Sequence, residues 1–579
     1  MTAGATAAPR LGRPAPWATT VDRLALPALL LLAAIMRLPD LATRGTWDGD
    51  QGHDMLVLRL LVRDGIVPLL GPPTSIGDVH HGAWYYYLLS PAAAVTGGDS
   101  PLAVVGLIAL AGIAAVGVVW WLARSVGGPL AGLVAGLVMA VSTAAIDEST
   151  FIWNPNLIAL SSAVALAGAW RAWSGGDRRW WLVAAVGTAV TMQCHVLGVA
   201  LLPIVGVPFL LDRRRRPMGA VPWVVLAVFV VAYLPLAINE LTSGLSETHA
   251  ALDYLAGGRS GVETAIPIRL GIVALRVVSW PLTGLITDGF VAGSLALVTV
   301  VAIVVALGWL RPRHPDAVGA TGTGATGTGV TGGGSAASAE TLAVRWLGLG
   351  LAWSALFLAI AAPSLAAVVR GLPNDHYHAF ADPMVFVLVG LGVARVAAPG
   401  RVGAGGSARR AGPGTLLVLA SIVALIVLVA WNLAHRPPPI HPDGGFPAGA
   451  IAATRVEQAL AAGGAAPGDV ARIRSLPDFK STEAMVYPLA RLGRTYIADT
   501  PKGFAPGGLT PTGPAAPSPV AGLVLLCDDL FRDSLGAACG GPAESAVAGD
   551  AGGPDWGPLI DRFEAAPGRF VSIYGRGPS

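Results

Sequence analysis

The sequence predicts an all-α polytopic membrane protein that carries a small α/β domain at its C-terminal end. The 579-residue chain is 54% hydrophobic and only 13% charged, whereas soluble proteins carry ~25% charged residues. Its apolar residues lie in long blocks, and ~20 such residues are enough to cross a bilayer as a helix. The net charge of +3 is too small for this length to indicate a nucleic-acid partner.

The apolar blocks predict about eleven transmembrane helices. The first block is expected to be an uncleaved signal anchor, because no small-residue cleavage site follows it. The amphipathic stretch 266–286 is either a further span or an interfacial helix. The predicted spans are residues 21–39, 101–123, 127–146, 155–173, 180–193, 195–211, 219–239, 289–310, 343–365, 380–397 and 414–433.

Arginine placement predicts the topology, because short translocated loops exclude arginine. Runs such as Arg213–Arg216 fall in alternate loops. Placing residues 1–20 in the cytoplasm puts all these runs on the cytoplasmic side. The transmembrane domain then covers residues 21–435 in the plasma membrane. Its predicted external parts are residues 40–100, 147–154, 240–288, 369–378 and everything after Asn432.

Two segments outside the spans have distinctive compositions. The cytoplasmic loop 317–338 is a Gly/Thr/Ala repeat, which predicts a disordered linker. Residues 436–579 are expected to form an extracytoplasmic α/β domain. Helices are predicted near 448–462 and 482–492, and strands near 522–526 and 569–574. Free thiols are unusual outside the cytoplasm, so Cys527 and Cys539 are expected to pair; two unpaired cysteines are the alternative.

The stretch Trp47–Asp54 directly follows the first span and gathers three carboxylates and one imidazole. If it begins a helix, Asp50, His53 and Asp54 share one face, while Asp48 suits the N-cap. A carboxylate beside an apolar wall can have a raised pKa and act as a general base. We therefore expect a catalytic role for Asp50, with Asp54 as its possible partner.

Further polar residues of the external loops are candidate substrate ligands. His80 and His81 precede four aromatic residues, which suit either a membrane-interface belt or a surface for sugar or lipid. Arginines near the interface can bind phosphate in a bidentate manner, although contact with lipid headgroups is the simpler reading for most of them. The predicted substrate-binding residues are Gln51, His53, Arg59, His80, His81, Tyr85, Glu148, His195, Arg370 and His376.

No cofactor is expected. A divalent metal stays open, because several acids and histidines of these loops could bind Zn²⁺ or Mn²⁺. Their spacing matches no metal motif. The residues concerned are Asp50, His53, Asp54, His80, His81, His376 and His378.

The order of these features resembles the polyprenyl-phosphate-dependent GT-C glycosyltransferases, in the branch of protein O-mannosyltransferases and aminoarabinose transferases. The similar segments are Gly49-Asp50-Gln51 in the first external loop and the stretch from His81 to Tyr86 before the next apolar helix. His195 falls where that family often has a polar residue between short spans. Gln51 stands where the family commonly has glutamate, so Asp50 acts either alone or with Asp54.

The resemblance implies a GT-C-like membrane domain and an inverting glycosyltransferase. Such an enzyme moves a sugar from a polyprenyl-phosphate donor to an extracytoplasmic acceptor, which is a protein, a lipid or a cell-wall glycan. The first-loop aspartate, here Asp50, would be the base. A transporter or lipid-linked sugar flippase is the main alternative, although such proteins often carry ionisable residues within their spans. A scaffold whose tail binds a wall component is a third possibility.

Overall fold

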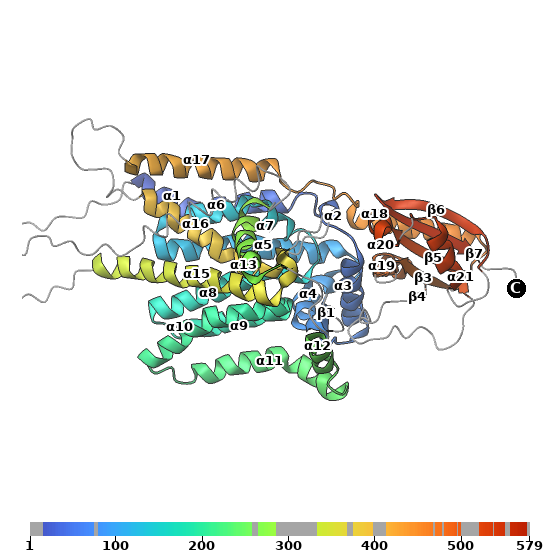
Figure 1. The fold of residues 1–579 in the computed structure, drawn as a ribbon, viewed down its shortest axis with the longest axis horizontal. Coiled ribbons are helices and arrows are strands. Elements are labelled where there is room, and N and C mark those ends of the chain that lie inside the picture. Colours follow the sequence, from blue (N-terminus) through green and yellow to red (C-terminus); the bar gives the residue numbers. More distant parts are fainter. Residues whose placement is uncertain are drawn as a thin grey trace, which may run out of the picture.

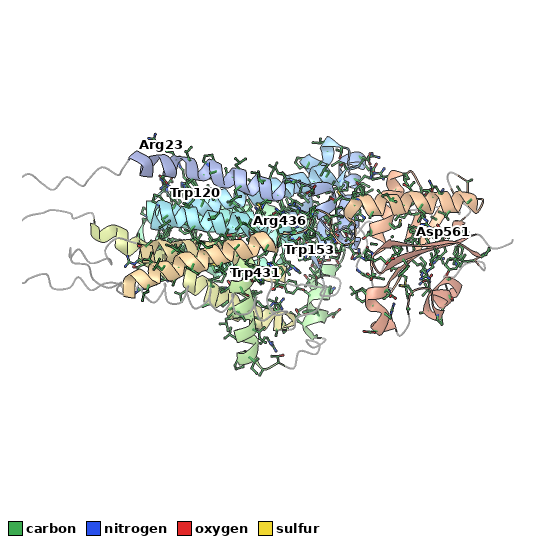
Figure 2. All side chains as sticks on the ribbon, turned by 90° about the horizontal axis from the view of Figure 1, so that it is seen from above. Arg23, Trp120, Trp153, Trp431, Arg436 and Asp561 are labelled. Carbon is green, nitrogen blue, oxygen red and sulfur yellow. A yellow bond between two sulfur atoms is a disulfide. The ribbon has the colours of Figure 1, made fainter. Side chains whose placement is uncertain are left out.

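The computed structural model shows a long helical bundle with a compact sheet domain at one end (Figure 1). Short helices and a two-stranded hairpin lie between these two parts. Arg23 lies at the end of the bundle away from the sheet domain, whereas Trp153 lies at the end that faces it (Figure 2). The structure describes residues 16–74, 79–256, 264–284, 333–366, 375–397, 413–466, 469–477, 480–494, 496–498, 520–535, 538–550 and 556–575.

Long apolar helices build the bundle. Six described helical segments are long and apolar enough to cross a membrane, and Ile266–Thr283 is one of them. The span expected at 289–310 lies outside the described residues. The bundle helices are α1 (Pro16–Arg37), α5 (Pro101–Gly127), α6 (Pro129–Val141), α8 (Ile158–Gly175), α9 (Trp180–Cys194), α10 (Leu201–Arg215), α11 (Val221–Thr242), α13 (Ile266–Thr283), α15 (Gly333–Ala361), α16 (Asp382–Ala397) and α17 (Pro413–Ala434). Helix α15 begins inside the range 317–338 that was expected to be a linker, and the rest of that range is not described.

Small residues let the bundle helices approach closely, as is common in membrane proteins. A Cβ atom added to Gly168 of α8 would lie 2.7 Å from the backbone nitrogen of Ala184 in α9. One added to Gly187 of α9 would lie 2.6 Å from the nitrogen of Ala165. Glycine at these two positions therefore allows the backbones of α8 and α9 to touch.

The segments between the bundle and the sheet domain come mostly from residues 40–100, which connect α1 to α5 (Figure 1). Helix α3 follows α1 and the short α2, and the β1–β2 hairpin leads into α4. The strands of this hairpin pair antiparallel. These elements are α2 (Leu41–Arg44), α3 (Gly49–Arg59), η1 (Leu60–Asp64), β1 (Leu70–Pro73), β2 (His80–Gly82), α4 (Trp84–Val95) and α12 (Ser246–Ala256). Other short elements are α7 (Thr143–Asp147), η2 (Asn154–Leu157), η3 (Val196–Ala200), η4 (Pro363–Ala366) and η5 (Asp375–His378).

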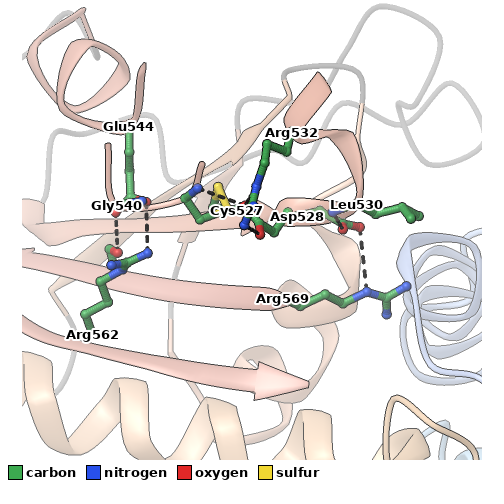
Figure 3. Close-up of a disulfide and its surroundings, with 11 residues drawn as sticks. Cys527, Asp528, Leu530, Arg532, Gly540, Glu544, Arg562 and Arg569 are labelled. Carbon is green, nitrogen blue, oxygen red and sulfur yellow. Dashed lines mark hydrogen bonds and ion pairs between the residues drawn. A yellow bond between two sulfur atoms is a disulfide. The ribbon is translucent and has the colours of Figure 1, made fainter. Parts of the chain in front are cut away.

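The C-terminal domain is a five-stranded mixed sheet in the order β4-β3-β5-β7-β6. Strand β3 is parallel to β4 and β5, whereas β7 is antiparallel to β5 and β6. The predicted disulfide between Cys527 and Cys539 is present, with the two Cα atoms 5.8 Å apart (Figure 3). The elements are α18 (Gly445–Ala462), β3 (Val470–Leu476), α19 (Glu483–Arg491), β4 (Tyr496–Ala498), β5 (Val520–Asp528), η8 (Asp529–Phe531), α20 (Arg532–Leu535), α21 (Pro542–Asp550), β6 (Leu559–Ala566) and β7 (Arg569–Gly575).

Candidate active site

Helix α3 begins with a capping box. The Asp48 carboxylate accepts a hydrogen bond from the Gly49 nitrogen at 2.8 Å, and the Gln51 carbonyl oxygen accepts one from the Asp48 nitrogen at 2.8 Å. The Gln51 amide also donates to the Ile152 carbonyl at 2.9 Å. Burial alone would raise the pKa of Asp48, but Arg569 and Lys480 outweigh it and hold the pKa below its usual value. Asp48 is thus an ionised cap, and both polar groups of Gln51 bind protein atoms.

Asp54 lies one turn further along α3 and is fully enclosed. It is 1% exposed, and its two oxygens accept hydrogen bonds from Tyr85 at 2.7 Å and Tyr86 at 2.9 Å. Burial raises the pKa of Asp54 to about 7, although His53 and the two tyrosines lower it in part. The residue therefore ties α3 to α4 and has little access to a substrate.

His53 links α3 to the C-terminal domain. Its Nδ1 lies 3.0 Å from a carboxylate oxygen of Glu483, the first residue of α19, and both side chains are 2% exposed. Burial alone would lower the pKa of His53, but Glu483 outweighs it and raises the pKa to about 9. A Cβ atom added to Gly52 would collide with the Glu483 backbone, so glycine is required for this approach of α19 to α3.

Asp50 is the carboxylate of this stretch that remains exposed. It lies in the first turn of α3. Although solvent reaches the side chain, the protein surrounds it closely, and this desolvation raises its pKa, with a further contribution from Asp48. A carboxylate with a raised pKa and access to solvent is suited to accept a proton from a substrate.

Three histidines from distant segments lie together; we call them the histidine cluster (His81, His195 and His376). The rings of His81 and His195 have centroids 4.8 Å apart, and those of His195 and His376 are 5.5 Å apart. Backbone N–H groups donate to Nδ1 of His81 and of His195, so Nε2 carries the proton in each neutral ring. Burial holds the pKa values of His81 and His376 well below the usual range.

A buried ionic network positions the segment that carries His376. Arg276 of α13 forms two hydrogen bonds with Asp375, at 2.9 and 2.7 Å. His378 bridges Asp375 and Asp382 at 3.3 and 3.0 Å. Burial alone would lower the pKa of His378, but Asp382 and Asp375 raise it to about 9. Because His376 lies between Asp375 and His378, the network fixes its place in the cluster.

The remaining predicted ligands have protein partners or lie elsewhere. Arg59 donates to the Ala490 carbonyl of α19 at 3.1 Å. Nδ1 of His80 lies 2.8 Å from Glu247 of α12. Glu148 accepts a hydrogen bond from Trp280 at 3.0 Å, and burial raises its pKa to about 8. Arg370 lies outside the described residues. The residues predicted from the sequence therefore do not form one site. Some lie on α3, some form the histidine cluster, and the others contact different parts of the protein.

The possible metal ligands do not converge. Within the described ranges of the chain, no three His, Cys, Asp or Glu side chains form a group that could hold a metal ion. The histidine cluster packs ring against ring instead, with Tyr377 and Trp153 beside it.

Known proteins share part of this sequence and the fold of this chain. Residues 80–238 match the family model for dolichyl-phosphate-mannose-protein mannosyltransferase. The crystal structure of ArnT from Cupriavidus metallidurans bound to undecaprenyl phosphate is similar at 12% sequence identity and a TM-score of 0.55, over 96% of this chain and 98% of that chain. The chain has the GT-C glycosyltransferase fold. No curated protein matches it.

A further GT-C structure is more distant. Archaeal oligosaccharyltransferase AglB from Archaeoglobus fulgidus has 15% identity and a TM-score of 0.49, over 97% of this chain and 75% of that chain. The match of residues 80–238 indicates a membrane glycosyltransferase of the class that uses lipid-phosphate-linked sugar donors, rather than a transporter or a scaffold. The fold agrees with this match.

Several residues of this GT-C site were not predicted from the sequence. Glu483 and Lys480 come from the C-terminal domain, and their place beside α3 has no local sequence signal. Asp375 and Arg276 lie 99 positions apart, yet they form a buried pair. Glu483 follows a serine and a threonine, which is a pattern typical of a helix start. The pattern predicts the helix but does not show that Glu483 contacts α3.

Proposed function

We propose that this GT-C enzyme transfers a sugar from a polyprenyl-phosphate donor to a hydroxyl group of an extracytoplasmic acceptor, with inversion, and that Asp50 is the base. One observation carries the assignment. Of the three aspartates at this end of α3, Asp48 is engaged as a cap and Asp54 by two tyrosines. Asp50 is exposed and has a raised pKa.

The reaction would proceed as one displacement at the anomeric carbon. Asp50 accepts the proton of the acceptor hydroxyl, and the acceptor oxygen forms a bond to that carbon. The bond from the carbon to the phosphate oxygen breaks, and polyprenyl phosphate leaves with the electron pair. Because the attacking and leaving oxygens lie on opposite faces, the configuration inverts. Asp54 takes no direct part in this reaction. It holds α3 in position by accepting hydrogen bonds from Tyr85 and Tyr86.

The leaving phosphate needs hydrogen-bond donors, and the histidine cluster can supply them. His81 and His195 are neutral rings with protonated Nε2 atoms. Neutral N–H donors can stabilise a bound anion. Because they carry no net charge, they need no counter-ion when no anion is bound. Arg370 remains a proposed phosphate ligand, close in sequence to His376. Arg276, in contrast, is neutralised by Asp375.

The proposed orientation places the N-terminus in the cytoplasm and the C-terminal domain outside the plasma membrane. Arginine placement supports this orientation. The disulfide between Cys527 and Cys539 also supports it, because such bonds persist in oxidising compartments. The donor lipid would then lie in the bilayer with its sugar near α3.

The class of donor can be tested directly. Membranes that contain the protein are incubated with a panel of radiolabelled polyprenyl-phosphate sugars, beside membranes without it. We expect protein-dependent loss of label from one donor and its appearance in a water-soluble or lipid-linked acceptor. Label that stays on every donor under all conditions, while the protein is folded, would contradict the proposal.

A further inference from the structure

A cavity of ≈ 100 Å³ lies where the start of α3 meets the C-terminal domain. One water needs ~10–15 Å³ of such space, so the cavity has room for roughly seven to ten water-sized groups, which suits one sugar ring. Its walls are largely apolar, and charged groups converge at one side. Such a combination is typical of small-ligand sites. The apolar lining residues include Trp47, Met485, Leu526, Phe570 and Val571.

The charged side chains of the cavity leave bonding capacity for a ligand. Asp528 uses one carboxylate oxygen to accept from the Leu530 nitrogen at 3.1 Å. Its other oxygen lies 3.6 Å from Lys480 Nζ and 3.7 Å from Arg569 Nε, beyond direct hydrogen-bond distance. Figure 3 shows Asp528 and Arg569 facing each other. A hydroxyl group placed there can donate to Asp528 and accept from either cation.

The charge balance indicates a neutral ligand. Three carboxylates line the cavity, from Asp48, Asp443 and Asp528, against the two cations of Lys480 and Arg569. Asp48 already binds both cations, at 2.9 and 2.8 Å. A phosphate would therefore meet excess negative charge, whereas neutral hydroxyls can use donors and acceptors alike.

The cavity also adjoins the proposed base. Asp48 lines the cavity and is separated from Asp50 by Gly49 alone, and the positive charge of Lys480 acts on the Asp50 carboxylate. We propose that this cavity binds a neutral sugar residue of the acceptor, so that the acceptor is a glycan and a neighbouring hydroxyl is presented to Asp50. This inference rests on the proposed function for its link to Asp50.

The test measures binding without catalysis. Full-length protein in lipid nanodiscs is mixed with the methyl glycosides of mannose, glucose, galactose and arabinose, and binding is followed by saturation-transfer NMR. We expect at least one glycoside to bind. Asp528→Asn should weaken that binding about tenfold or more, since it removes a charged hydrogen-bond acceptor. If Asp528→Asn fails to fold, Lys480→Gln is used instead. It removes the cation that would donate to the same hydroxyl group and should weaken binding as well.

The matched control is Asp561→Asn. Asp561 pairs with Arg455 at 2.7 Å in the same domain but does not line the cavity, so this variant should bind as the wild type does. Binding of no glycoside, equal binding by the Asp528→Asn and wild-type proteins, or displacement by inorganic phosphate would overturn the inference. Asp50→Asn separates the two proposals: it should keep glycoside binding, and if it also kept normal sugar transfer, the base assignment would fail while the cavity assignment stood.

Discussion

His53 and Glu483 lie 430 positions apart in the sequence, yet the imidazole Nδ1 is 3.0 Å from the carboxylate in a site that solvent hardly reaches. The pair connects the helix that carries Asp50 to the C-terminal domain. A buried ion pair is costly to break, because the remaining charge has no partner. The geometry of the proposed base therefore depends on the docking of the C-terminal domain.

Glu483→Gln should destabilise the protein by about 3–5 kcal/mol near neutral pH. The pKa of His53 is raised from 6.5 to about 9 by this contact. Its contribution to stability is complete below the unfolded pKa and is lost as the pH rises through about 9. Thermal unfolding in detergent between pH 6 and 10 should show this loss in the wild type and not in the variant. Identical pH profiles for the two proteins would contradict a charged His53.

Gly52→Ala should separate α3 from α19, because the added methyl group collides with the Glu483 backbone. The expected result is faster cleavage between the bundle and the C-terminal domain in limited proteolysis, together with a lower unfolding temperature. Gly106→Ala is the control, since a Cβ atom there meets open space in α5. Equal behaviour of the two variants would show that the close approach of α3 to α19 is not required.

Asp54→Asn should leave the fold intact. It should also make the free energy of unfolding less dependent on pH. The pKa of Asp54 is raised from 3.8 to about 7, so the folded protein holds this proton more tightly than the unfolded chain does. Stability from this group therefore falls as the pH rises from about 4 to about 7. Unfolding of both proteins across this range should show the fall in the wild type alone. If the stability of the variant fell in the same way over this pH range, the fall would have to come from other titratable groups.

Local sequence patterns were sufficient for the elements that depend on neighbouring residues. Asp48 was expected to cap a helix, and it does so in a capping box at the start of α3. Cys527 and Cys539 were expected to pair, because of their compartment and not because of any geometric signal. Strand β6 was missed, since its residues are intermediate or exposed and show no buried alternation.

Contacts between distant segments were beyond what the sequence could reveal. Arg276 lies in the amphipathic stretch 266–286, and only the fold shows that Asp375 neutralises it. From the sequence, Asp50 is expected to be the base, and Asp54 on the same helical face is expected to assist it or to have no catalytic role. Their difference comes from Tyr85 and Tyr86 on α4, which enclose Asp54 and leave Asp50 exposed.

The most direct test of the central claim compares sugar transfer by Asp50→Asn and by Asp54→Asn, both in membranes and at equal protein level. Loss of a general base lowers a rate by about 10²- to 10⁴-fold, so Asp50→Asn should lose transfer to that extent while remaining folded. Wild-type transfer should also fall as the pH drops through the raised pKa of Asp50. Full activity of Asp50→Asn, or loss confined to Asp54→Asn, would contradict the assignment of Asp50 as the base.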